Sequence, residues 1–259
     1  MQNLVHQIVF NDSGRVSISG YAKDAAKSVC SALDFCEYKI WGLNEADKFI
    51  RERFDSSIYA AFKCLKPYAY KADLFKYCLL YQLGGWYVDI GVRILQPEAF
   101  KKITVSKFVL FRATGFWDAP WSSSVALVYA EPGSEVFLTA LDEIVENCRK
   151  QNYGENPLCP TMSSFGRALA KHNVISGVRV GMIVDVKGQE YKRAYRLKPL
   201  GLIAARKPSL VKVGSLQGLG IEGSNNYSEM WKNRNIYNSQ EAHSIPKPWV
   251  RRFTKHIRM

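Results

Sequence analysis

A helical segment, a double glycine and an alternating segment follow one another between residues 68 and 95. Apolar side chains recur at helical spacing over residues 68–83, and Gly84 and Gly85 supply the left-handed stop that many helix ends adopt. From Trp86 to Leu95 apolar and other residues alternate, which predicts a single strand with two different faces. Asp89 lies on the polar face of this predicted strand, near its carboxyl end. Open α/β sheets bind ligands at that end of their strands, so we expect Asp89 to face a ligand.

The preceding chain predicts the first units of an α/β fold. An apolar strand over residues 4–10 ends at the turn sequence NDSG, and residues 23–33 are predicted to be helical. Residues 36–44 alternate well enough for a second strand, and residues 44–63 predict two helical segments. This order of elements predicts a mostly parallel central sheet flanked by helices.

The rest of the chain continues this pattern and then changes. We expect strands within residues 105–112 and 122–130, and helices over residues 135–150 and 163–172. From about residue 174 the sequence predicts a C-terminal part of strands and loops. Residues 249–259 place Trp249, Phe253 and Ile257 four apart among basic residues, which predicts a basic amphipathic helix. We therefore expect one domain over residues 1–248 and a separate tail over residues 249–259.

Composition restricts the class of protein. Hydrophobic residues make up 47% of the chain and charged residues 23%, as in ordinary globular domains. No apolar run is long enough to span a bilayer, and the N-terminus lacks the pattern of a secretory signal, so we expect a cytoplasmic protein. The six cysteines include no C-x-x-C pair, which favours reduced thiols over zinc or disulfide frameworks. The net charge of +13 favours anionic partners.

Two charged residues of the predicted helix belong with Asp89. Asp73 and Lys76 are three positions apart and so share a helix face. Carboxylates accept hydrogen bonds from ribose or sugar hydroxyls and bind hard divalent cations, while a lysine offsets the charge of a diphosphate. The helix, the double glycine and the strand therefore predict a site for a nucleotide diphosphate.

These residues resemble the sugar-binding region of DXD-containing glycosyltransferases of the family 32 type, which have the GT-A fold. That family includes capsule and lipopolysaccharide transferases, fungal initiating mannosyltransferases and clostridial glucosylating toxins. The resemblance rests on Asp73, Lys76, the double glycine, Tyr87 and Asp89. It extends to HQIVF at residues 6–10, YKIW at 38–41, EPGSEVF at 131–137 and NPLCPTMSSFGRAL at 156–169. The fold class implied is a GT-A-like α/β domain.

The resemblance also implies roles for individual residues. Asp73 would bind the ribose or the donor sugar, and Lys76 stands where the family usually has an arginine that contacts the donor. Tyr87 belongs to the same donor-binding motif, and Asp89 matches the first aspartate of DXD, with a catalytic role alongside Lys76. Gly91 takes the place of the second aspartate, which in relatives usually touches a divalent cation such as Mn²⁺ or Mg²⁺. Asp-x-Gly in place of Asp-x-Asp therefore puts the expected metal site in question.

A glycine-rich segment near the C-terminus resembles the closing loop of family members. Residues 218–237 offer oxygen ligands at Glu222, Asn225 and Asn226, which could complete the metal site with Asp89. Ser228 and Trp231 would contact the diphosphate. Closure of such a loop excludes water from an activated sugar.

These observations predict an enzyme that moves a sugar from a nucleotide-sugar donor, with a UDP-sugar favoured, to a glycan or lipid-linked saccharide acceptor. The resemblance implies surface polysaccharide or lipopolysaccharide synthesis and retention of the anomeric configuration. The basic tail is either solvated or bound to the inner, anionic membrane face as a peripheral contact. Two alternatives stay open: a degenerate protein that binds sugar nucleotides without turnover, motivated by Gly91, and a basic nucleic-acid-binding protein. We expect no nucleic-acid partner, because no stacking surface of interleaved aromatic and basic residues is evident.

Overall fold

The computed structural model describes residues 4–103, 106–112, 123–173, 177–186, 191, 193–206 and 226–246. Its helices are α1 (Gly20–Ala32), α2 (Leu43–Arg53), α3 (Ser56–Cys64), α4 (Tyr68–Gln82), α5 (Pro97–Lys101), α6 (Glu135–Lys150), α7 (Met162–Lys171), α8 (Tyr227–Lys232) and α9 (Ser239–Ser244). Its strands are β1 (Leu4–Ile8), β2 (Glu37–Trp41), β3 (Gly85–Val88), β4 (Val92–Ile94), β5 (Phe108–Arg112), β6 (Ser123–Ala130), β7 (Val178–Asp185), β8 (Arg193–Leu197) and β9 (Gly201–Arg206). The α/β class is confirmed, and each of the helices expected before residue 172 forms.

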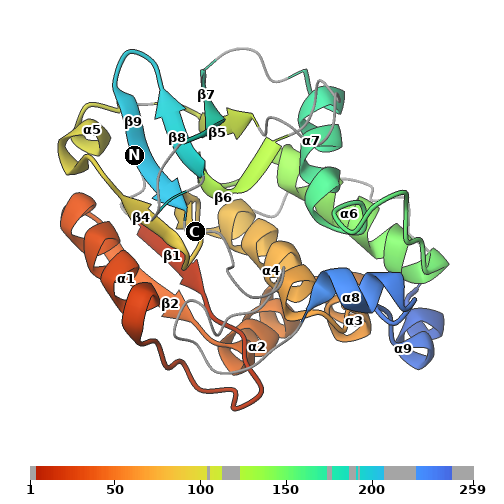
Figure 1. Ribbon diagram of the computed structural model, residues 1–259. Coiled ribbons are helices and arrows are strands. Elements are labelled where there is room, and N and C mark those ends of the chain that lie inside the picture. The colour runs from red at the N-terminus through yellow and green to blue at the C-terminus, as the bar shows by residue number, and fades with distance from the viewer. Residues whose placement is uncertain are drawn as a thin grey trace.

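The described strands form one large sheet with the order β2-β1-β3-β6-β5-β7-β8-β9-β4 (Figure 1). The expected parallel arrangement holds for β2, β1 and β3, and again for β5 with β7. The other pairings between described strands are antiparallel. One physical reason lies in the connections: residues 198–200 form a short turn between β8 and β9, and short turns join antiparallel strands.

The expectation of one continuous strand from Trp86 to Leu95 is wrong. The amide of Val92 donates to the carbonyl of Asp89 at 2.9 Å, and this turn separates β3 from β4. β3 is an interior strand between β1 and β6, whereas β4 is an edge strand that pairs with β9. Neighbouring segments of the chain thus belong to distant positions in the strand order, so the sheet curls back on itself. Alternation in the sequence could not detect this turn, because Ile90 and Gly91 fit the same two-residue period.

Helices cover both faces of the sheet, and β3 contributes to both layers (Figure 1). Trp86 and Val88 pack in a core with α1 and α5, whereas Tyr87 packs in the larger core with α4, α6 and α7. The predicted alternation is confirmed for these residues. Asp89 follows directly after β3, at the carboxyl end of the strand, as the sequence predicts.

The double glycine is required where α4 passes into β3. Gly84 has φ +63°, and a Cβ there would come 2.6 Å from Cδ of Pro132. Gly85 has φ +92°, and a Cβ there would come 2.5 Å from the carbonyl oxygen of Leu4. Both positions therefore combine a left-handed backbone with a close approach that leaves no room for a side chain. The predicted helix stop is confirmed, and it fixes the direction in which the chain enters β3.

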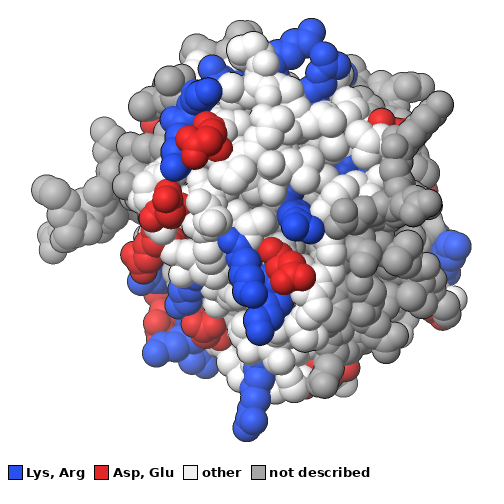
Figure 2. All heavy atoms as spheres, turned by 60° about the vertical axis from the view of Figure 1, so that its left-hand side comes forward, with Lys and Arg blue, Asp and Glu red and all other residues white. Residues whose placement is uncertain are grey.

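Charged side chains of both signs are interspersed on the surface. Figure 2 shows acidic side chains among the lysines and arginines over the described part of one face. The excess of positive charge is therefore not gathered into a single basic patch on that part of the face. No helix among the described residues combines the length and apolar character needed to cross a membrane.

Candidate functional site

Asp73 and Lys76 lie on the face of α4 that points toward β3. The ammonium of Lys76 is 3.0 Å from Oδ1 of Asp73 and 4.3 Å from the ring centroid of Tyr87. Lys76 is only 2% exposed, whereas the Asp73 side chain keeps 16% of its surface open. A buried ammonium is stable in such a place because the carboxylate and the aromatic ring replace the water that it loses. The predicted shared face of Asp73 and Lys76 is confirmed.

Tyr87 and Asp89 connect this ion pair to the end of β3. The hydroxyl of Tyr87 donates to Oδ1 of Asp89 at 2.7 Å. Burial, and after it the nearby Asp89 carboxylate, raises the pKa of Tyr87 well above its usual range, so the hydroxyl keeps its proton and remains a donor. The Asp89 backbone is fixed as well, because its amide donates to the carbonyl of Ala126 in β6 at 2.8 Å. The Asp89 side chain is 25% exposed and so stays accessible.

Arg206 at the end of β9 is a candidate site residue that the sequence analysis did not identify. One guanidinium nitrogen, Nη2, lies 3.5 Å from Oδ2 of Asp89. β4 pairs with β9 so that Val92 stands opposite Arg206, and the turn places Val92 three residues after Asp89. The Arg206 side chain is 50% exposed. The mainly apolar stretch GLIAAR is typical of a strand, but no sequence signal shows that its last residue meets Asp89.

The loop before α7 supplies another missed residue, Thr161. Its hydroxyl donates to Oδ2 of Asp73 at 2.8 Å, and the residue is completely buried. Thr161 belongs to the segment NPLCPTMSSFGRAL that supported the resemblance, which was the available signal. Together, these contacts form one continuous chain from Thr161 through Asp73, Lys76, Tyr87 and Asp89 to Arg206.

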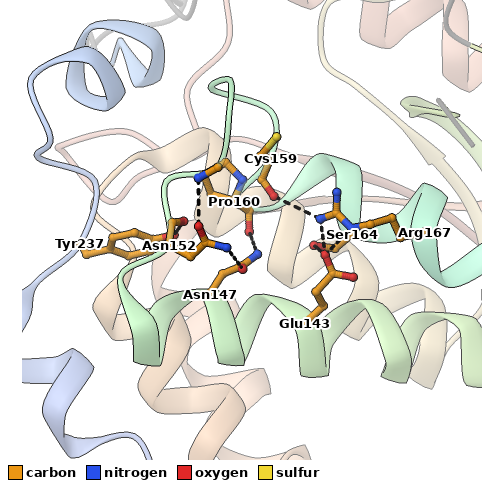
Figure 3. A network of polar contacts seen from close by, with 9 residues as sticks. Glu143, Asn147, Asn152, Cys159, Pro160, Ser164, Arg167 and Tyr237 are labelled. Carbon is orange, nitrogen blue, oxygen red and sulfur yellow. Dashed lines mark hydrogen bonds and ion pairs between the residues drawn. The ribbon is translucent and has the colours of Figure 1, made fainter. Parts of the chain in front are cut away.

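A polar network holds this loop in place (Figure 3). Nδ2 of Asn147 on α6 donates to the carbonyl of Pro160 at 3.2 Å, and the guanidinium of Arg167 on α7 pairs with Glu143. Nδ2 of Asn152 donates to Oδ1 of Asn147 at 3.0 Å, and the hydroxyl of Tyr237 donates to the carbonyl of Asn152 at 2.6 Å. The two ends of the loop are thus tied to α6, which fixes Thr161 relative to Asp73.

The short helix α8 carries Tyr227, Ser228 and Trp231. The ring of Tyr227 lies 5.7 Å from the ring of Tyr70 on α4. Burial raises the pKa of Tyr227, Arg206 opposes this rise, and the carboxylates of Asp73 and Asp89 add to it. Trp231 instead donates from Nε1 to the carbonyl of Tyr153 at 2.8 Å, while Ser228 is half-buried on the same helix. Tyr227 was not predicted as a site residue.

His6 has a structural environment beneath the site. Its Nδ1 accepts from Nε1 of Trp41 at 3.2 Å, and its Nε2 lies 3.0 Å from the carbonyl of Gly84, to which it donates. Burial lowers the pKa of His6 to about 4; the hydrogen bond to the Gly84 carbonyl opposes this shift, and the charge of Lys39 adds to it. The neutral ring thus joins β1 to β2 and to the double glycine.

The described residues do not form a cation site of the kind that the resemblance implies. Of the four predicted ligands, Glu222 and Asn225 lie outside the described residues. Oδ1 of Asn226 accepts from the amide of Glu229 as the N-cap of α8, and both oxygens of Asp89 already face Tyr87 and Arg206. Gly91 lies in the turn and offers only its carbonyl, which accepts from the hydroxyl of Tyr21 at 3.4 Å. Within the described residues no three His, Cys, Asp or Glu side chains gather so as to hold a metal ion.

A hollow of about 370 Å³ lies elsewhere, between α2, α3 and α4. Its lining includes Lys71, whose pKa is lowered by burial to about 8. The ammonium of Lys71 donates to the carbonyl of Phe62 in the last turn of α3, where a cation stabilises the helix end. Lys71 therefore has a sufficient structural explanation, and the hollow includes none of the site residues named above.

Comparisons with known proteins bear on the same segment. Residues 21–107, about a third of the chain, match the family model described as "Glycosyltransferase sugar-binding region containing DXD motif". This segment includes α4, β3 and the turn after it, so the resemblance drawn from the sequence is confirmed for it, with Asp-x-Gly at the motif. No curated protein matches the chain. Among the solved structures that match is one titled "PaToxG Glycosyltransferase", with 16% identity, a TM-score of 0.47, and coverage of 66% of this chain and 68% of that chain.

Proposed function

We propose that the protein is a glycosyltransferase that transfers a sugar from a nucleotide-sugar donor to a saccharide acceptor. The observation that carries this proposal is the accessible Asp89 carboxylate at the carboxyl end of β3, joined by contacts to Asp73 and Lys76 within the matched sugar-binding region. A nucleotide-sugar donor has groups that can bind both the carboxylates and the cationic side chain of this site. Its hydroxyl groups are donors for carboxylates, and its diphosphate is an acceptor for cationic side chains.

The chemistry sets different demands on the two ends of the donor. Breaking the bond between the anomeric carbon and the diphosphate develops positive charge on the sugar and negative charge on the leaving group. The sugar passes to a hydroxyl of the acceptor, that hydroxyl loses its proton, and a nucleoside diphosphate leaves. We assign Asp73 and Asp89 to the hydroxyls of the ribose and the sugar. Lys76 acts mainly on Asp73, because its ammonium is buried against that carboxylate.

The finer parts of the proposal concern the donor and the acceptor. We favour a UDP-sugar donor, retention of configuration, and an acceptor in surface polysaccharide or lipopolysaccharide synthesis, including a lipid-linked saccharide. Ser228 and Trp231 are proposed to border the donor from α8, and Tyr87 and Gly91 to shape its pocket. These assignments follow from the resemblance, and each of them is part of the hypothesis.

A second candidate function is a protein that binds a sugar nucleotide without turnover. The Asp-x-Gly sequence favours it, because one of two carboxylates expected in the motif is missing. Incubation with UDP-sugars and detection of released UDP separates the two functions. Release of UDP, even by slow hydrolysis of the donor, supports the transferase, and tight binding without any release supports the second candidate.

The proposal is tested by a thermal-shift panel of UDP, GDP and CMP, each with and without Mn²⁺. A ligand at about a hundred times its dissociation constant stabilises the fold by roughly 2.7 kcal/mol. At roughly 2 to 4 °C per kcal/mol, UDP should raise the melting temperature by about 5 to 10 °C. Asp89→Asn should remove most of this shift, because it deletes the charge and keeps an oxygen for the Tyr87 hydroxyl.

The matched control is Glu98→Gln, since the Glu98 side chain is 74% exposed on α5 and pairs only with Lys101 among the described residues. It should leave the UDP shift unchanged. Equal shifts for wild type and Asp89→Asn would remove Asp89 from the donor site and overturn the proposal.

The proposed membrane contact depends on residues 249–259, which lie outside the described residues. The sequence pattern of that tail is the motivation. Each Lys or Arg near an anionic surface adds roughly 1 kcal/mol to binding. Deletion of residues 249–259 should abolish sedimentation with anionic liposomes and leave UDP release unchanged. Sedimentation that persists after the deletion would contradict the contact.

A further inference from the structure

A guanidinium, that of Arg206, lies beside Asp89, where the resemblance implies a divalent cation. Oδ1 of Asp89 accepts from Tyr87, and Oδ2 faces Nη2 of Arg206 at 3.5 Å. A hard cation needs several oxygen ligands, and Gly91 contributes no carboxylate next to this pair. A bound cation would also have to approach a positively charged side chain at short range. The N–H donors of this guanidinium therefore favour an anion, rather than a second cation, as the next ligand.

Main-chain contacts fix the position of Arg206, so its place beside Asp89 does not depend on the flexible side chain alone. Its Cα stands opposite Val92 in the β4–β9 pairing and opposite Arg193 in the β8–β9 pairing. The Asp89–Val92 turn then brings the end of β3 to the same place. Each of these contacts is a strand pairing or a main-chain hydrogen bond, so the guanidinium is presented at the carboxyl end of β3 in the absence of any ligand.

We propose that the Arg206 guanidinium, in place of a divalent cation held by the Asp-x-Gly motif, binds the diphosphate of the donor. This inference rests on the proposed function, since it names the group that recognises the leaving phosphates. A guanidinium has five N–H donors, and within the described part of the chain the approach to Asp89 at 3.5 Å is its one ion pair, which leaves other N–H groups for phosphate oxygens. The half-exposed side chain is open to such a ligand.

The charge balance of the motif supports this exchange. Two carboxylates and a divalent cation have a formal charge of zero, and so do one carboxylate and one guanidinium. A site with Gly91 and Arg206 therefore has the same formal charge toward a diphosphate as a site with a second carboxylate and a divalent cation. A guanidinium also matches phosphate oxygens with a fork of parallel hydrogen bonds.

A purely structural role for Arg206 is the competing explanation, because its ion pair with Asp89 also ties β9 to β3. The two roles differ in what they predict for ligands with and without phosphates. A structural role alters the whole pocket, so uridine and UDP lose affinity alike. A diphosphate contact affects UDP and leaves uridine unchanged.

The test measures dissociation constants of UDP and uridine by calorimetry in excess EDTA and in excess Mn²⁺. For the wild type, UDP should bind in EDTA, with less than about a threefold change on adding Mn²⁺. Arg206→Gln should weaken UDP in EDTA by about tenfold or more and change uridine by less than about twofold, and Arg206→Lys should fall between Gln and wild type. Tyr59→Phe, on the remote surface of α3, is the control and should bind both ligands as the wild type does.

A gain-of-function variant extends the test. Gly91→Asp combined with Arg206→Gln restores two carboxylates and removes the guanidinium, so UDP binding should now strengthen about tenfold or more on adding Mn²⁺. Should this double variant fail to fold, the Arg206→Gln and Arg206→Lys results decide the matter alone.

Three results would overturn the inference. If UDP binding is lost in EDTA, and Arg206→Gln does not change it in Mn²⁺, then a metal ion rather than Arg206 binds the diphosphate. That result would leave the proposed function intact. Equal weakening of uridine and UDP would make Arg206 structural. Absence of binding by UDP, GDP and CMP to every form would overturn both the inference and the proposed function.

Discussion

The candidate site has two halves that are held in different ways. The N-terminal half is Asp73, Lys76, Tyr87 and Asp89 on α4 and β3, where Lys76 and Tyr87 are each 2% exposed. The C-terminal half is Thr161, Arg206 and Tyr227, supplied by a loop, by the end of β9 and by α8. The first half depends on close packing around the double glycine and His6. The second depends on a hydrogen bond, an ion pair, a ring contact and the pairing of β9 with β4 and β8. Packing defects should therefore damage the fold in the first half, whereas changes in the second should alter ligand affinity.

The largest effect is expected from Gly85→Ala. The new Cβ would lie 2.5 Å from the Leu4 carbonyl at φ +92°, so strain and steric overlap act together. We expect a loss of about 3 kcal/mol or more in the free energy of unfolding. Gly133→Ala is the matched control, because φ is +77° there and nothing lies within 4 Å of the added Cβ; its cost should be about 1 kcal/mol. Urea unfolding measures both, and equal losses would show that the close approach at Leu4 is not rigid.

His6 should make stability depend on pH. The pKa of His6 is about 4 in the folded protein and about 6.5 in the unfolded chain. Between these values the unfolded chain binds a proton that the folded protein excludes. The free energy of unfolding should therefore fall by about 3 kcal/mol as pH drops from about 6.5 to about 4, and this contribution should be constant above that range. His6→Gln should lack this part of the pH dependence in urea unfolding at several pH values. Parallel curves for the two proteins would contradict the buried neutral state of His6.

Thr161→Val tests the C-terminal half through ligand affinity. The change keeps the shape of the side chain and removes the donor to Oδ2 of Asp73. The bond orders the Asp73 carboxylate for a hydroxyl of the ligand, and a hydrogen bond to a charged group contributes about 1.5 kcal/mol or more. Without this ordering, UDP should bind about tenfold more weakly. Thr139→Val is the control, since its hydroxyl contacts His172 on the surface of α6 and α7. Calorimetry that finds the same UDP affinity in both variants would remove Thr161 from the site.

Trp231→Phe is expected to have the smallest effect. It deletes the hydrogen bond from Nε1 to the Tyr153 carbonyl, which should lower the free energy of unfolding by about 1 kcal/mol. Tyr237→Phe deletes the comparable bond to Asn152 and should cost about the same. We expect UDP affinity to change by less than about threefold in both variants. A tenfold loss specific to Trp231→Phe would instead establish the diphosphate contact predicted from the sequence.

The same division explains how far the sequence could be interpreted. Asp73 and Lys76 were placed correctly because helical periodicity alone puts them on one face. Tyr87 and Asp89 followed from the double glycine and the alternation after it. These relations act over a few residues, so they are visible in a sequence.

The remaining site residues depend on contacts between distant segments. Arg206 meets Asp89 because β9 pairs with β4, and Thr161 meets Asp73 because α6 and α7 hold a loop against α4. Nothing in the local pattern around either residue specifies its partner. The turn at residues 89–92 could not be predicted for a different reason. Its residues follow the alternation of a strand, so the local pattern predicts a continuous strand that does not form.

That turn has a consequence for variation in chain length. It joins an interior strand to the far edge of the curled sheet, and it carries both Asp89 and the residue opposite Arg206. Inserting one amino acid between Asp89 and Val92 would shift β4 by one step against β9 and exchange its buried and open faces. Substituting Ile90 or Gly91 leaves the spacing of carboxylate and guanidinium intact, whereas any insertion or deletion between Asp89 and Val92 would separate them.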